Sequence, residues 1–125
     1  MDWQLTFDRS TLMVAVIALF VPTLGEELLF RVIMLPAPGQ HRPFPWLAAS
    51  ISIAAFVLWH PLQGLLFGGE RAAIFTDGGF LFAVFCLGIA CTRAWWKTGS
   101  IWPCVILHWL VVVCWKSFAG GPPLV

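Results

Sequence analysis

Apolar residues fill four stretches of this chain, and short polar or turn-forming segments separate them. The stretches cover about residues 10–35, 44–60, 80–97 and 100–118. A run of about 20 apolar residues can cross a bilayer as an α-helix, because each residue adds about 1.5 Å to the length of the helix. The pattern therefore predicts an all-α fold, an integral membrane bundle of about four transmembrane helices.

Proline and glycine positions predict where these helices bend and end. Pro22 lies inside the first stretch, where we expect a kink. The dipeptide His60-Pro61 is expected to end the second helix short of a full span and to leave a bent or partly re-entrant end. Gly99 suits the end of the third helix, Ser100 the N-cap of the fourth, and Pro103 the first turn that follows.

The remaining segments are short. Residues 1–9 alternate between apolar and polar side chains, so we expect them to lie at the membrane interface with Trp3 as an anchor. Asp2 and Asp8 are unlike the basic start of a signal peptide, so we expect the first apolar stretch to remain in the mature protein. Residues 68–79 are expected to form a polar loop that contains a short turn at 72–75.

Composition supports a membrane protein with one domain over residues 1–125. The chain is 60% hydrophobic and 10% charged, whereas a soluble domain is about half apolar and about a quarter charged. A net charge of +1 gives no electrostatic footprint for nucleic acid, so the expected partner is the lipid bilayer. Basic side chains are divided three against three between the two sides of the expected bundle, which leaves its orientation open. These are Arg9, Arg71 and Lys116 on one side, and Arg42, Arg93 and Lys97 on the other.

The four cysteines are expected to be buried free thiols. Cys86, Cys91, Cys104 and Cys114 all lie in apolar stretches and form no CxxC pair. That spacing excludes a typical zinc cage of cysteines. A free cysteine in an apolar setting behaves as a small hydrophobic residue.

Two adjacent acids and an arginine interrupt the first apolar stretch. Glu27 and Arg31 are four residues apart with the acid on the N-terminal side, the favourable order for an ion pair on one helical face. Glu26 lies about 100° around the helix and has no partner within it. Ionisable groups at membrane depth cost about 2.5–3.5 kcal/mol each, so they persist where they are paired, face a polar cavity or do chemistry. A purely structural ion pair accounts for Glu27 and Arg31 and leaves Glu26 unexplained.

Two histidines complete a set of intramembrane polar groups. His60 stands at the end of the second stretch and His108 near the middle of the fourth. One interpretation makes Glu26 a general base that takes a proton from water, with one or both histidines orienting that water or stabilising the oxyanion. In the other interpretation, His60, His108 and Glu26 bind zinc as a His₂Glu set, although the usual HExxH spacing is absent.

The ordered set of motifs resembles that of the CAAX prenyl protease 2 and bacteriocin-processing family, also called Abi, of glutamic intramembrane proteases. The matching segments are Glu26-Glu27-Leu28-Leu29-Phe30-Arg31, Phe56-Val57-Leu58-Trp59-His60, and the approach to His108 that begins at Thr98. The resemblance covers about residues 24–112. It implies a minimal Abi-type core that hydrolyses a peptide bond of a membrane peptide or protein, without a metal or other cofactor.

The resemblance also implies a role for each matching residue. Glu26 resembles the base that activates water, His60 the histidine that orients the water, and His108 the histidine at the oxyanion site. The supporting residues are Glu27, Arg31 and Phe56.

One family position differs in this chain. The family carries Asn or Asp four residues after the third-motif histidine, and this chain has Val112, which cannot donate a hydrogen bond. A backbone amide or the Trp109 indole would have to supply the donor. The sequence therefore leaves two functions open: a glutamic endopeptidase, or a catalytically impaired relative that acts as a binding or assembly subunit of a larger membrane complex.

Overall fold

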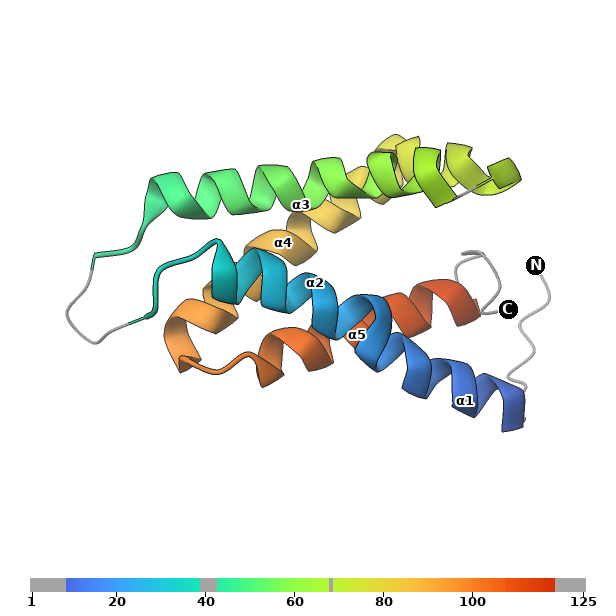
Figure 1. Cartoon of the computed structure of the whole chain (residues 1–125), viewed down its shortest axis with the longest axis horizontal. Helices are drawn as coiled ribbons and strands as arrows, with labels where there is room; N and C mark the ends of the chain where they lie inside the picture. Colours follow the sequence, from blue (N-terminus) through green and yellow to red (C-terminus); the bar gives the residue numbers. More distant parts are fainter. Residues whose placement is uncertain (1–8, 39–42, 68, 119–125) are drawn as a thin grey trace.

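A computed structural model describes residues 9–38, 43–67 and 69–118, and this part of the chain is helical without strands (Figure 1). Four helical rods form a bundle, as the sequence predicts. The first rod joins α1 (Arg9–Ala18), the π-helical η1 (Leu19–Leu24), α2 (Gly25–Glu27) and the π-helical η2 (Leu28–Ile33). The other three rods are α3 (Trp46–Phe67), α4 (Gly78–Thr98) and α5 (Trp102–Phe118), and the 3₁₀-helix η3 (Gly69–Thr76) lies between α3 and α4 in the sequence. α4 packs against both α3 and α5, and the first rod also packs against α3 and α5.

The first rod is kinked where the sequence predicts it. Val21 has the non-helical angles φ −134° and ψ 116°. The ring of the following Pro22 disfavours the helical region for the residue before it, which explains the extended conformation. π-helical segments lie on both sides of Glu26 and Glu27. Such widened turns are frequent at functional sites, because they re-aim side chains that a regular helix would place elsewhere.

The predicted end of the second helix at His60-Pro61 is wrong. α3 continues through Pro61 to Phe67 and has 22 residues, a length of roughly 33 Å at 1.5 Å per residue. The His60 ring contributes a side-chain hydrogen bond at this point, since its Nδ1 donates to the carbonyl oxygen of Phe56 at 2.7 Å. The helical hydrogen bond that Pro61 cannot make is the one to the Val57 carbonyl, four residues earlier, so the His60 bond to Phe56 does not replace it. The chain then turns into η3, which packs back against α3.

Caps set the ends of the last two helices. Asp77 accepts the backbone N–H three residues further along, at 3.0 Å, and so starts α4. Gly99 ends α4 with a left-handed φ of 67°, as expected of a glycine at this position. Ser100 Oγ accepts the N–H of Trp102 at 3.3 Å, and Pro103 lies in the first turn of α5. The predictions made for Gly99 and Pro103 are therefore confirmed. Ser100 binds the first turn of α5 but lies one residue before the N-cap, because the Ile101 carbonyl accepts the first helical bond, from Val105 at 2.9 Å. Residues 1–8 lie outside the described part of the chain.

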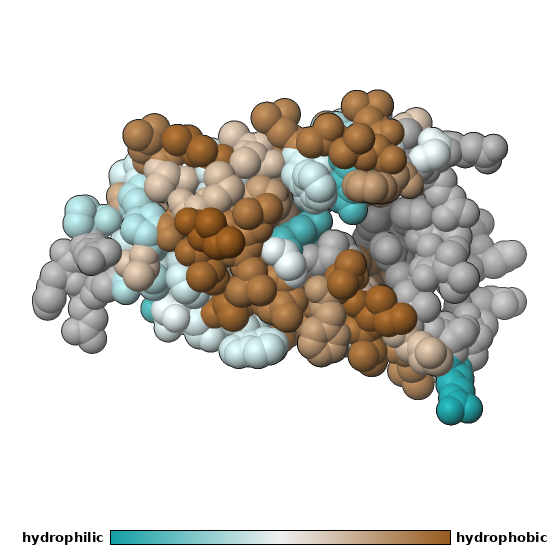
Figure 2. Space-filling view, viewed as in Figure 1, coloured by the Kyte–Doolittle hydropathy of each residue, from teal (hydrophilic) through white to brown (hydrophobic). Residues whose placement is uncertain are grey.

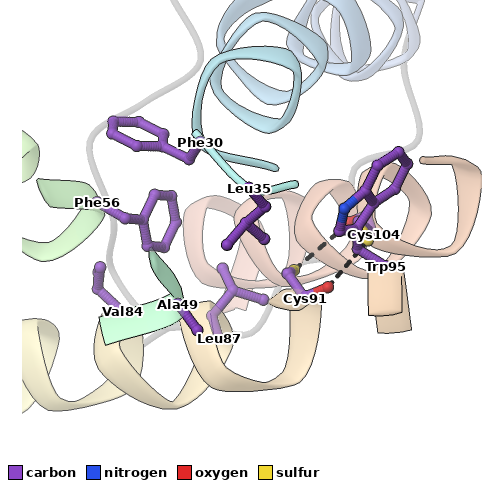
Figure 3. Close-up of a cluster of buried hydrophobic side chains, with 9 residues drawn as sticks. All are labelled: Phe30, Leu35, Ala49, Phe56, Val84, Leu87, Cys91, Trp95 and Cys104. Atoms are coloured by element: carbon purple, nitrogen blue, oxygen red, sulfur yellow. Dashed lines mark hydrogen bonds between the residues drawn. The ribbon is translucent and has the colours of Figure 1, made fainter. Parts of the chain in front are cut away.

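The apolar core between the rods is small (Figure 3). α3 and α4 approach closely at Gly88, where an added Cβ would lie 3.1 Å from the Phe56 ring. α4 and α5 are joined by the cysteine thiols, because Cys104 Sγ donates to the Cys91 carbonyl at 3.0 Å and Cys91 Sγ to the Cys104 carbonyl at 3.7 Å. The expectation that all four cysteines are buried is wrong for Cys86 and Cys114, which are exposed on the outer faces of their helices.

The outer surface is strongly apolar (Figure 2). Leu65 and Phe67 are 76% and 77% exposed, and Ile33 is 72% exposed. α3 and α4 are each long and apolar enough to cross a membrane. Polar groups are buried inside while large apolar side chains face outward, the arrangement expected of a helical bundle whose solvent is lipid.

The contact between α3 and η3 depends on the absence of a side chain at Gly64. A Cβ there would lie 2.7 Å from Phe75 Cβ, closer than carbon atoms approach, and Phe75 Cβ is fixed by its backbone. We expect Gly64→Ala to destabilise the protein by about 1–3 kcal/mol, the usual range for overpacking. Thermal unfolding in detergent micelles measures this, with Gly78→Ala as the control, because an added Cβ at Gly78 meets nothing within 4 Å. Equal melting temperatures for the two variants would contradict the close contact.

Candidate active site

The Glu27–Arg31 pair forms as the sequence predicts, and it is completely buried. Arg31 Nε lies 3.3 Å from Glu27 Oε2, an ion-pair distance without hydrogen-bond geometry. The other two guanidinium nitrogens reach the neighbouring helices, since Nη1 donates to Ser52 Oγ on α3 and Nη2 to the Gly88 carbonyl on α4, both at 3.4 Å. The guanidinium carbon also lies 4.9 Å from the centre of the Phe56 ring. Arg31 therefore joins three of the four rods.

His108 bridges the two adjacent glutamates from the opposite rod. Its Nδ1 lies 2.9 Å from Glu27 Oε1, and its Nε2 lies 3.5 Å from Glu26 Oε2. His108 is 1% exposed and Glu26 is 7% exposed, so both contacts are shielded from solvent. α5 thus supplies the partner that Glu26 lacks within its own helix.

The two contacts of His108 differ in geometry. A carboxylate can only accept, so the hydrogen bond between Nδ1 and Glu27 places a hydrogen on Nδ1. The 3.5 Å approach of Nε2 to Glu26 Oε2 lacks hydrogen-bond geometry, and this oxygen has no hydrogen-bond partner among the described residues. His108 is therefore bound firmly to Glu27 and only approaches Glu26.

Glu26 has a second partner that was not predicted from the sequence. Trp59 Nε1 donates to Glu26 Oε1 at 3.1 Å, across the contact between α3 and the first rod. The sequence contained one indication of this contact. Trp59 lies inside an apolar stretch, and a buried indole N–H usually finds an acceptor. One oxygen of Glu26 is thus held by Trp59 while the other faces His108.

His60 is buried with its tautomer fixed by the backbone. A carbonyl oxygen only accepts, so the 2.7 Å contact with the Phe56 carbonyl places the hydrogen on Nδ1. In the neutral ring, Nε2 then carries the free lone pair. The rings of His60 and His108 both contact the Phe56 ring, with centroids 4.9 and 5.6 Å away. Phe56 therefore lies between the two histidines and the Arg31 guanidinium, and both histidines point into the bundle.

Ser52 is another buried member of the cluster that was not predicted from the sequence. Besides accepting from Arg31, its hydroxyl donates to the Phe30 carbonyl at 2.5 Å. Ser52, Phe56 and His60 recur every four residues, so they lie along one face of α3. This spacing was the signal in the sequence that could have placed Ser52 with the cluster.

The Trp109 indole is not available as a replacement for the missing third-motif side chain. Its N–H donates to the Ala15 carbonyl at 2.6 Å and so holds α5 against α1. Val112 is partly buried one turn after His108. Of the two substitutes considered from the sequence, only a backbone amide remains.

The zinc alternative would need three ligands grouped around one ion. Among the described residues, no three His, Cys, Asp or Glu side chains are grouped so that they could hold a metal ion. His108 directs its two nitrogens at Glu27 and Glu26, and His60 directs Nδ1 at a backbone carbonyl.

Comparison with known proteins identifies one family. A sequence profile described as type II CAAX prenyl endopeptidase Rce1-like matches residues 8–114. No curated protein and no solved structure matches the chain. The matched range includes all of the polar cluster and the four rods that position it, except the last four residues of α5.

The two adjacent glutamates should differ in their effect on stability. Glu27→Gln would leave the buried Arg31 guanidinium and His108 without their carboxylate, and removing one partner of a buried pair costs about 3–5 kcal/mol. Glu26→Gln keeps an oxygen for Trp59 and should cost much less. Thermal unfolding of both variants in the same detergent measures the difference. An equal loss of stability in the two variants would contradict the prediction that Glu27 contributes more to folding than Glu26.

Proposed function

Because the chain belongs to the type II CAAX prenyl endopeptidase Rce1-like family, whose members are membrane-integral endopeptidases, we propose that it hydrolyses a peptide bond with water activated by Glu26. The observation that carries this proposal is the 3.5 Å approach of His108 Nε2 to Glu26 Oε2 across two rods, with Nδ1 bound to Glu27. We assign one shared proton to Glu26 and His108, which makes the set of two carboxylates, Arg31 and this proton neutral. A carboxylate that shares a proton with an imidazole can take up and return a proton without a change in the net charge of the site.

The reaction follows from this arrangement. With the shared proton on His108, Glu26 is a carboxylate and takes a proton from the attacking water. The water oxygen bonds to the carbonyl carbon of the substrate, and the resulting oxyanion accepts a hydrogen bond from His108 Nε2–H. Glu26 then returns the proton to the nitrogen of the leaving amine as the C–N bond breaks, which leaves a carboxyl and an amine product. Peptide and water are the reactants, and no metal or other cofactor takes part.

The other members position these two groups. His60 orients the attacking water through Nε2, the nitrogen left free by the hydrogen bond of Nδ1 to the backbone. Glu27 accepts from His108 Nδ1 and so directs Nε2 toward the reacting atoms, while Arg31 holds Glu27. Trp59 fixes the orientation of the Glu26 carboxylate. Phe56 supports both histidine rings and the guanidinium.

All four rods cross the bilayer in this proposal. The first rod has 25 residues from Arg9 to Ile33, more than the roughly 20 that a spanning helix needs, and its outer side chains are apolar like those of α3 and α4. The substrate is a membrane peptide or protein whose scissile bond reaches the buried cluster. The protein is then a multi-pass membrane enzyme.

Val112 favours a second candidate function. It stands where the family has a hydrogen-bonding side chain, and the nearby Trp109 N–H is bound to Ala15. Loss of one oxyanion donor typically lowers the rate by about 10²–10³. A chain impaired in this way would keep the polar cluster for stability and act as a binding or assembly subunit of a larger membrane complex.

Glu26→Gln should abolish cleavage of a prenylated membrane peptide by the purified protein, because an amide cannot accept the proton of the water. The matched control is Asp77→Asn, which makes the same acid-to-amide change at an exposed cap where Asn also caps. Product formation measured by mass spectrometry separates the two variants. Activity that is lost with a chelator and restored by zinc would contradict the metal-free mechanism.

Val112→Asn distinguishes the two functions, because residues 108 and 112 lie on one face of α5. In an impaired protease the new donor beside His108 should raise cleavage by up to about 10²–10³. In a binding subunit the variant should give no cleavage and lose about 1–3 kcal/mol of stability, because a polar amide replaces a packed apolar side chain. Robust cleavage by the unmodified protein, absent in Glu26→Gln, would rule out the binding subunit.

A further inference from the structure

A large groove lies between α3 and α4, away from the polar cluster. Its volume is about 990 Å³, and neither Glu26 nor either histidine of the cluster lines it. The lining side chains extend from Trp46 to Leu58 on α3 and from Phe85 to Lys97 on α4. Each of these ranges rises roughly 18 Å, so the groove is long and narrow and follows the two helices. Its wall is almost entirely apolar except near one end.

The polar end of the groove carries two cations. Arg93 and Lys97 are four residues apart on α4, and both are exposed. Among the described residues, no acidic side chain lines the groove or lies within 4 Å of either cation. Trp46 and Trp96 line the same end, where Phe44 contacts both rings. Tryptophans with Lys or Arg mark the headgroup level of a bilayer, so the remainder of the groove lies at the depth of the acyl chains.

We propose that this groove binds one anionic phospholipid of the surrounding bilayer. The phosphate binds the exposed Arg93 and Lys97, and an acyl chain lies along the apolar wall. Lipid that merely surrounds the protein needs no cation pair at the end of an apolar groove. The two cations, with no acidic side chain near them among the described residues, select an anionic lipid over a zwitterionic one.

Native mass spectrometry of the full chain tests this proposal. The protein, stripped in detergent, is titrated with palmitoyl-oleoyl phosphatidylglycerol and, separately, with the phosphatidylcholine of the same chains. One phosphatidylglycerol should be retained, with a preference of about thirtyfold, because each cation near an anionic headgroup contributes about fivefold. Arg93→Gln with Lys97→Gln should remove the preference, and both side chains are exposed, so the variant is expected to fold.

Two further variants test whether the retained lipid occupies this groove. Arg9→Gln removes an exposed cation far from the groove and should leave retention unchanged. Glu26→Gln should abolish proteolysis without altering lipid retention, so failure of the lipid site and failure of the proposed protease are distinguishable.

Four outcomes would overturn the proposal. The first is equal retention of the two lipids, which would reduce the groove to a chain-binding surface. The second is an equal loss of preference in Arg9→Gln, which would assign the effect to net charge. The third is a dimer that excludes lipid, which would make a second copy of the chain the occupant. The fourth is a prenylated peptide that stays bound to the protein when phosphatidylglycerol is added and that prevents binding of the lipid, which would show that the groove binds substrate.

Discussion

The buried carboxylate of Glu27 is the group on which the rest of the bundle depends. It contacts Arg31 on its own rod and His108 on α5, and Arg31 in turn reaches Ser52 on α3 and Gly88 on α4. These contacts connect all four rods through one ionic cluster. Because lipid tails give helices no hydrophobic reason to associate, such polar contacts and close packing determine which helices meet.

The two adjacent glutamates have different surroundings. Glu27 is fully buried and directs its oxygens at Arg31 and His108. Glu26 accepts a hydrogen bond from Trp59 and lies 3.5 Å from His108, a looser contact. The proposed division between a positioning Glu27 and a proton-transferring Glu26 rests on this difference.

The prolines at positions 22 and 61 affect their helices differently. Pro22 kinks the first rod just before the glutamates, and the preceding Val21 leaves the helical conformation. Pro61 does not end α3, which continues to Phe67. A proline alone therefore does not decide whether a membrane helix ends; the outcome depends on what surrounds the backbone groups that it disrupts.

Sequence by itself determined the apolar stretches, the kink at Pro22, the caps around Gly99 and the Glu27–Arg31 pair, because each of these depends on neighbours within a few residues. It also identified Glu26, His60 and His108 as groups too costly to face lipid. Only the tertiary structure decided which residues contact the polar groups. Trp59 donates to Glu26, and His108 contacts both glutamates. Ser52 accepts from Arg31, and Trp109 donates to Ala15. Those contacts join residues 21 to 94 positions apart, and their existence depends on how rods rotate and pack, which no local pattern encodes.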